Sequence, residues 1–67
     1  MNDQEAPPLY RVKELTEVSD ESIENALNSE ARSGFRFESI HFVIQPGNRR
    51  PTMAFLFFAL TRAPENT

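Results

Sequence analysis

Met53-Ala54-Phe55-Leu56-Phe57-Phe58-Ala59-Leu60 is apolar at every position. A strand with one face in water alternates apolar and polar residues, because successive side chains point to opposite faces of the sheet. This run does not alternate, so as a strand it needs cover on both faces. We therefore predict a central strand over residues 52–61, and the rest of the chain has to supply what lies on either side of it.

The segment before residue 35 carries the signals of one helix. Ser19 is a good N-cap, and Asp20 and Glu21 place negative charge in the first turn, where the helix dipole favours it. Gly34 tolerates the left-handed conformation that commonly follows a helix C-terminus. The predicted apolar stripe is narrow and consists of Ile23, Ala26, Leu27 and Ala31.

Residues 9–18 predict a first strand that lies at an edge of the sheet. Tyr10 and Val12 share one face of this strand, and Arg11 and Lys13 share the other. Charged side chains of this kind protect an edge strand from pairing with other chains. We expect Tyr10 to be a core residue whose hydroxyl reaches water.

Residues 35–45 predict a second strand that forms a hairpin with the third. Its apolar residues change parity near Glu38-Ser39, and a β-bulge there would bring them to one side. Pro46-Gly47 is typical of a type II turn, with Pro51 at the start of the third strand. The residues that the bulge would align are Phe35, Phe37, Ile40, Phe42 and Ile44.

These elements predict an α+β fold with a single β-α-β-β domain over residues 9–61. The most apolar strand belongs in the centre and the charged one at an edge, which gives a three-stranded sheet of order 1-3-2 with the helix packed on one face. Residues 1–8 are expected to be a disordered lead, and residues 62–67 a disordered tail.

One helix covers one face of such a sheet at most, so the other face predicts an interface. The candidate interface residues are Phe55, Leu56, Phe57, Phe58 and Val43. Since the chain is short and has no cysteine, self-association is the remaining support for a small core, and we expect a homodimer or docking on another protein. The alternative is a monomer whose strongly twisted sheet closes over the helix.

Composition limits the classes of function. With no cysteine and one histidine, the chain predicts no metal site and no cofactor. The net charge of −3 disfavours nucleic acid or anionic membrane as the main partner. The acidic start of the chain lacks the features of a signal peptide, and eight apolar residues are too few to span a bilayer as a helix. We expect a cytoplasmic protein of bacterial type.

No group of residues predicts catalysis, and we expect the protein not to be an enzyme. Arg49 and Arg50 at the hairpin tip are candidate anion-binding residues, although a solvated turn kept soluble by charge is the favoured explanation. His41 is expected to be a partly buried surface residue without a catalytic partner. The acidic residues around the helix start, Glu14, Glu17, Asp20, Glu21 and Glu24, lack the spacing of a calcium loop.

Two further functions remain open at this point. Single-stranded nucleic acid could stack its bases on the phenylalanines of the sheet, with Arg49 and Arg50 reaching the phosphates. A small-molecule binder would need a cavity above the apolar face.

The segment from the helix end into the second strand carries a family resemblance. Leu27-Asn28, Ala31 and Gly34-Phe35-Arg36-Phe37-Glu38-Ser39-Ile40, after a strand that begins near Tyr10, resemble the small bacterial proteins grouped as domain of unknown function 4177. In that family the helix ends in a Gly-Trp-Glu-Leu-like segment; Phe35 stands here in place of tryptophan and Phe37 in place of leucine. The resemblance covers residues 10–60. It implies a β-α-β-β fold and, because the family has no established activity, no site.

Overall fold

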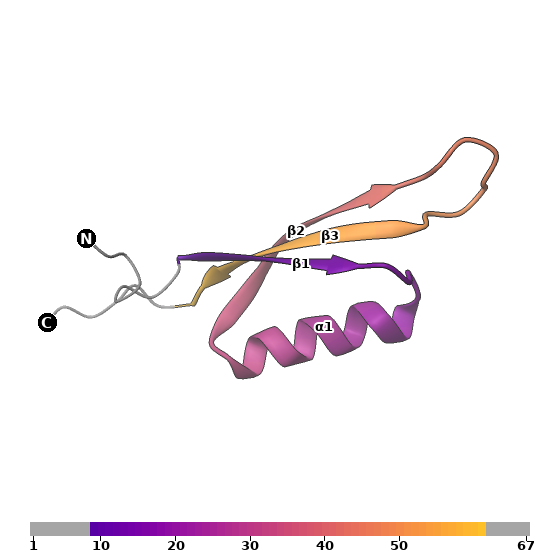
Figure 1. Cartoon of the computed structure of the whole chain (residues 1–67). Helices are drawn as coiled ribbons and strands as arrows, with labels where there is room; N and C mark the ends of the chain where they lie inside the picture. The colour runs from indigo at the N-terminus through magenta and orange to yellow at the C-terminus, as the bar shows by residue number, and fades with distance from the viewer. Residues whose placement is uncertain (1–8, 62–67) are drawn as a thin grey trace, which may run out of the picture.

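The elements follow one another in the predicted order β-α-β-β in a computed structural model, which describes residues 9–61 (Figure 1). The predictions of disorder for residues 1–8 and 62–67 lie outside the described residues. No helix in the described part of the chain is long and apolar enough to cross a membrane. The elements are β1 (Tyr10–Leu15), α1 (Asp20–Arg32), β2 (Phe35–Val43) and β3 (Met53–Leu60).

The apolar run forms the central strand. The three strands make one sheet of order β1-β3-β2, and β3 pairs antiparallel with both neighbours. The central strand has a neighbour on each side, so its backbone groups are hydrogen-bonded in both directions. The α+β fold class and the 1-3-2 order are therefore confirmed.

The second strand contains the predicted bulge. Phe37 pairs with Phe58 and Ser39 pairs with Phe57, so the register shifts at Glu38, which has no partner on β3. This shift keeps the phenylalanines before the bulge and the apolar residues after it on one face of the sheet. The aligned residues are Phe35, Phe37, Ile40 and Phe42, while Ile44 lies beyond the end of the strand.

The hairpin turn also has the predicted geometry. The backbone N–H of Asn48 donates to the carbonyl of Gln45 at 3.0 Å, and Gly47 has a φ of +89°. A positive φ at the third turn position after a proline defines a type II turn. The turn is thus built around Pro46-Gly47, as the sequence predicts.

Both ends of α1 are fixed by local signals. The hydroxyl of Ser19 accepts from the backbone N–H of Ser22 at 3.0 Å, and the hydroxyl of Ser22 accepts from the backbone N–H of Ser19 at 3.0 Å. This reciprocal pair is a capping box. Beyond the C-terminus, Gly34 has a φ of +92°, a backbone conformation that favours glycine.

The core lies between α1 and one face of the sheet. Leu56 and Phe58 of β3 are fully buried there, and α1 lies on one side of the sheet (Figure 1). Ile23 and Leu27 of α1 pack against this cluster, as predicted. The buried core residues are Leu15, Ala26, Phe35, Ala54, Leu56 and Phe58.

One position of the predicted helix stripe is wrong. Ala31 is exposed, and Glu30 is buried instead. The Glu30 carboxylate accepts from the Arg11 guanidinium at 2.9 Å (Nη1 to Oε1), and the Arg11 Cζ atom lies 4.1 Å from the centre of the Phe35 ring. A charged side chain is tolerated in this position because it is paired and hydrogen-bonded.

The Arg11–Glu30 pair shows which face of β1 points to the helix. Arg11 and Lys13 lie on the helix side, and Tyr10 and Val12 lie on the opposite side. The prediction that Tyr10 belongs to the core is wrong, since its relative exposure is 71%. The alternation in β1 is real, but the apolar half of it faces away from the only helix in residues 9–61.

The helix does not cover its own side of the sheet completely. Figure 1 shows the hairpin end of β2 moving away from α1, as the right-handed twist of a sheet brings about. Phe42, near the hairpin end of β2, is 48% exposed for this reason. The hairpin turn lies further out still (Figure 1).

Candidate functional site: the open face of the sheet

The face of the sheet opposite α1 is the candidate site, and we call it the open face. Its members follow from the register, since paired residues of neighbouring strands share a face. Tyr10 pairs with Ala59, Val12 with Phe57 and Ser39 with Phe57. The open face comprises Tyr10, Val12 and Glu14 of β1, Met53, Phe55, Phe57 and Ala59 of β3, and Arg36, Ser39, His41 and Val43 of β2.

The centre of the open face is apolar and accessible. Val12 and Phe57 are 53% and 38% exposed, and they are direct cross-strand partners. Tyr10 lies next to them on the same strand face, and Phe55 is half-buried beside Phe57. Exposed apolar residues that are scattered singly are ordinary, but a contiguous group is typical of an interaction site.

His41 lies against this apolar centre. Its ring packs edge-on against Phe57, with ring centres 5.3 Å apart and an interplanar angle of 86°. Its Nε2 atom is 3.4 Å from the hydroxyl of Ser39. His41 is exposed rather than partly buried as predicted, because the open face has no element above it in residues 9–61. The Ser39 contact is long for a hydrogen bond and does not provide the short base–nucleophile contact of a catalytic pair.

The charged residues of the open face lie at its edges. Glu14 on β1 has no ion pair within residues 9–61. Arg36 on β2 pairs with Glu38, Nε to Oε2 at 3.0 Å, and also donates to the carbonyl of Leu60. The open face therefore carries one unpaired acidic group on β1 and one histidine on β2, with the apolar strand β3 between them.

The predicted interface residues divide between the two faces. Phe55, Phe57 and Val43 lie on the open face. Leu56 and Phe58 are fully buried under α1, so they belong to the core and are removed from the candidate interface. Adjacent residues of a strand point to opposite faces, and the run of apolar residues in β3 holds no signal for which set the helix covers.

Tyr10, Val12, Glu14 and His41 belong to the site and were not predicted there. Their signal is present in the sequence, since Tyr10 and Val12 share one face of an alternating strand. That signal predicts a buried face, and it becomes evidence for an interface only once the position of α1 is known.

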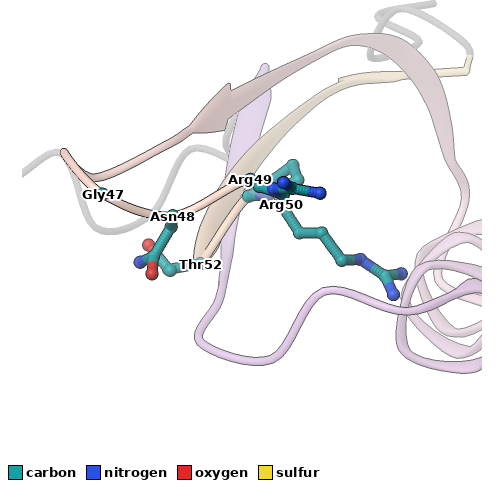
Figure 2. Close-up of a pocket in the computed structure, with 6 residues that line it drawn as sticks. Gly47, Asn48, Arg49, Arg50 and Thr52 are labelled. Atoms are coloured by element: carbon teal, nitrogen blue, oxygen red, sulfur yellow. The ribbon is translucent and has the colours of Figure 1, made fainter.

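The hairpin turn holds the two arginines predicted to bind an anion. Residues 47–52 line an open depression (Figure 2). The Arg50 side chain extends away from Asn48 and Thr52 (Figure 2). Arg49 and Arg50 also line this depression, and anion binding by them stays a prediction.

No group of three or more histidine, cysteine or acidic side chains in residues 9–61 is placed to hold a metal ion. The chemistry that the open face offers is apolar contact with a charged edge.

No protein family, curated protein or solved structure that was compared matches this chain. The resemblance to domain of unknown function 4177 therefore stays a prediction. The case for a function rests on the open face itself.

Proposed function

We propose that the protein is a non-enzymatic interaction module whose open face binds a second copy of the same chain. The observation that carries the proposal is the exposed apolar group Tyr10, Val12 and Phe57 on the side of the sheet without a helix. Sheets that pack face to face with a two-fold axis between them bury such a group symmetrically.

The alternation in β1 supports the proposal. Arg11 and Lys13 lie on the helix side, where one of them is held by an ion pair with Glu30. Tyr10 and Val12 lie on the side that an isolated chain leaves in water. In an isolated domain this orientation of β1 buries Leu15 and forms the Arg11–Glu30 pair but leaves Tyr10 and Val12 in water. A dimer adds the burial of Tyr10 and Val12 in both copies.

The size of the open face predicts a weak dimer. Six residues at about 3.3 Å each give a length of about 20 Å, and three strands about 4.8 Å apart give a width of about 14 Å. The flat footprint is then about 280 Å², and side-chain relief increases the accessible area above this value. Stable interfaces bury about 800 Å² on each partner. We therefore expect a dissociation constant in the micromolar range or weaker.

Single-stranded nucleic acid is less well supported as the occupant. A strand of nucleic acid requires basic groups along the surface that carries the aromatic rings. The open face has one arginine, Arg36, which is paired with Glu38, and one unpaired acidic residue, Glu14. Arg49 and Arg50 lie in the hairpin turn, away from the apolar centre of the face.

Two adjacent substitutions test the proposal. Phe57→Glu changes an exposed residue of the open face and is expected to give a folded monomer. Phe58→Glu buries a carboxylate in the core, and the cost of several kcal/mol exceeds the stability that so small a core supplies, about 3–5 kcal/mol. The second variant is expected to be unfolded. Circular dichroism reports the fold, and sedimentation equilibrium reports the mass.

Phe42→Glu is the matched control, because Phe42 is 48% exposed but lies on the helix side of the sheet. The proposal predicts that this variant stays folded and dimerises like the wild type. A dimer that survives Phe57→Glu, or one that is lost with Phe42→Glu and kept with Phe57→Glu, contradicts the open face as the interface.

A further inference from the structure

The open face is organised in rows that run across the three strands, with a residue of β3 in the middle of each. One row is Glu14–Phe55–His41, because Phe55 pairs with both outer residues. The next row is Val12–Phe57–Ser39. The third is Tyr10–Ala59–Arg36. Every row therefore has one β1 residue and one β2 residue at equal distances, about 4.8 Å, on either side of β3.

A two-fold axis that runs along β3 exchanges the two ends of each row. The β1 strand of one copy then lies over β2 of the partner, and the β3 strands of the two copies lie over each other. Glu14 faces the partner's His41, and Tyr10 faces the partner's Arg36. Phe55 and Phe57 face themselves at the axis, where the apolar contact is best protected from water. The small angle between stacked sheets moves the rows little near the axis.

We propose that the second copy binds in this orientation, with two symmetric contacts between Glu14 and the partner's His41 at the borders of a phenylalanine centre. This inference rests on the proposed dimer and adds its geometry. The observation behind it is hydrogen-bonding complementarity, since the axis brings the carboxylate acceptor and the imidazole N–H donor of one row together.

The other simple arrangement is less favourable. A two-fold axis that runs across the strands, centred on the row of Phe57, places each strand over the same strand of the partner. The two strands of each such pair run in opposite directions. Glu14 then faces the partner's Tyr10, and His41 faces the partner's Arg36. The first contact places a carboxylate against a neutral tyrosine, and the second places two hydrogen-bond donors, the guanidinium and the imidazole N–H, against each other.

The groups around His41 within its own copy do not compete strongly for it. On β2 the charged neighbours are Arg36 and Glu38, which pair with each other at 3.0 Å. The β3 strand has no titratable residue between Met53 and Leu60. On β1, Glu14 of the same copy is separated from His41 by the whole width of β3, and Tyr10 lies two rows away. Arg11 and Lys13 lie on the other side of the sheet.

Mixing two single variants tests the orientation directly. Glu14→Arg alone places an arginine against each partner's His41, and His41→Glu alone places two carboxylates together. In a mixed dimer one border pairs the introduced arginine with the introduced glutamate, and the other keeps the native pair. Both positions are exposed, so both variants are expected to fold. Native mass spectrometry of an equal mixture then reports the three dimers.

We expect the equilibrium constant for forming the mixed dimer from the two homodimers to be about tenfold above its statistical value. High salt should remove this preference. A statistical mixture of dimers overturns the orientation while the proposed dimer stands. A wild-type protein that is monomeric at every concentration overturns the proposed function and the orientation with it.

Discussion

At the residue scale, Glu30 of α1 shows how an ion pair with a strand residue, Arg11 of β1, makes a buried charge possible. It occupies a core-facing position of α1 and is 4% exposed. Helical spacing alone assigns that stripe to alanine and aliphatic residues, and Ala31 was expected to complete it. The guanidinium of Arg11, held over the Phe35 ring, is what makes the buried carboxylate tolerable. This pairing spans 19 positions of the chain, so no local pattern reports it.

Removing Arg11 is expected to destabilise the domain. Arg11→Met leaves the Glu30 carboxylate buried without its cation, and we expect a loss of about 1–3 kcal/mol in the free energy of unfolding. The lower part of this range reflects the partial exposure of the Arg11 side chain, 41%. Urea denaturation in the Phe57→Glu background measures the effect without a contribution from dimerisation.

Lys13→Met is the control for this measurement. Lys13 lies on the same side of β1 but is exposed and has no ion pair within residues 9–61. Its loss is expected to change the free energy of unfolding by no more than about 0.5 kcal/mol. The double variant Arg11→Met with Glu30→Leu should recover much of the stability, because it removes the unpaired charge. Equal effects of Arg11→Met and Lys13→Met would contradict the structural role of the pair.

At the element scale, the local signals predict the boundaries well. The cap at Ser19, the glycine at 34, the bulge at Glu38 and the Pro46-Gly47 turn are each short-range features, and each has the expected geometry. The strand order follows from the same logic, since the run without polar residues occupies the centre. The local signals do not predict on which face of the sheet α1 packs.

The capping box gives a direct test at this scale. Ser19→Ala removes the acceptor for the backbone N–H of Ser22, which lies 3.0 Å away. We expect a loss of about 1 kcal/mol in the free energy of unfolding. Ser29→Ala, at an exposed position inside the helix, is the control and should leave the stability equal or slightly higher. A Ser19→Ala variant as stable as the control would show that the cap contributes nothing.

At the scale of the whole molecule, β3 is apolar on both faces, but α1 covers only one of them. The uncovered face is the open face. The sequence predicts that one face lacks cover and names five residues of the two hairpin strands. Leu56 and Phe58 turn out to be core residues, and Phe55, Phe57 and Val43 lie on the open face. Tyr10 and Val12 join them because of the packing of α1, which depends on long-range contacts such as Arg11–Glu30. The site was therefore only half predictable from the sequence.

The mass of the wild-type protein in solution decides whether the open face binds a second copy of the chain. Sedimentation equilibrium over a range from about 1 µM to 1 mM spans the affinities expected for so small an interface. We expect a mass that rises with concentration from that of one chain toward that of two, and a Phe57→Glu variant whose mass stays that of one chain. A wild-type mass that remains that of one chain across the whole range would contradict the proposed dimer.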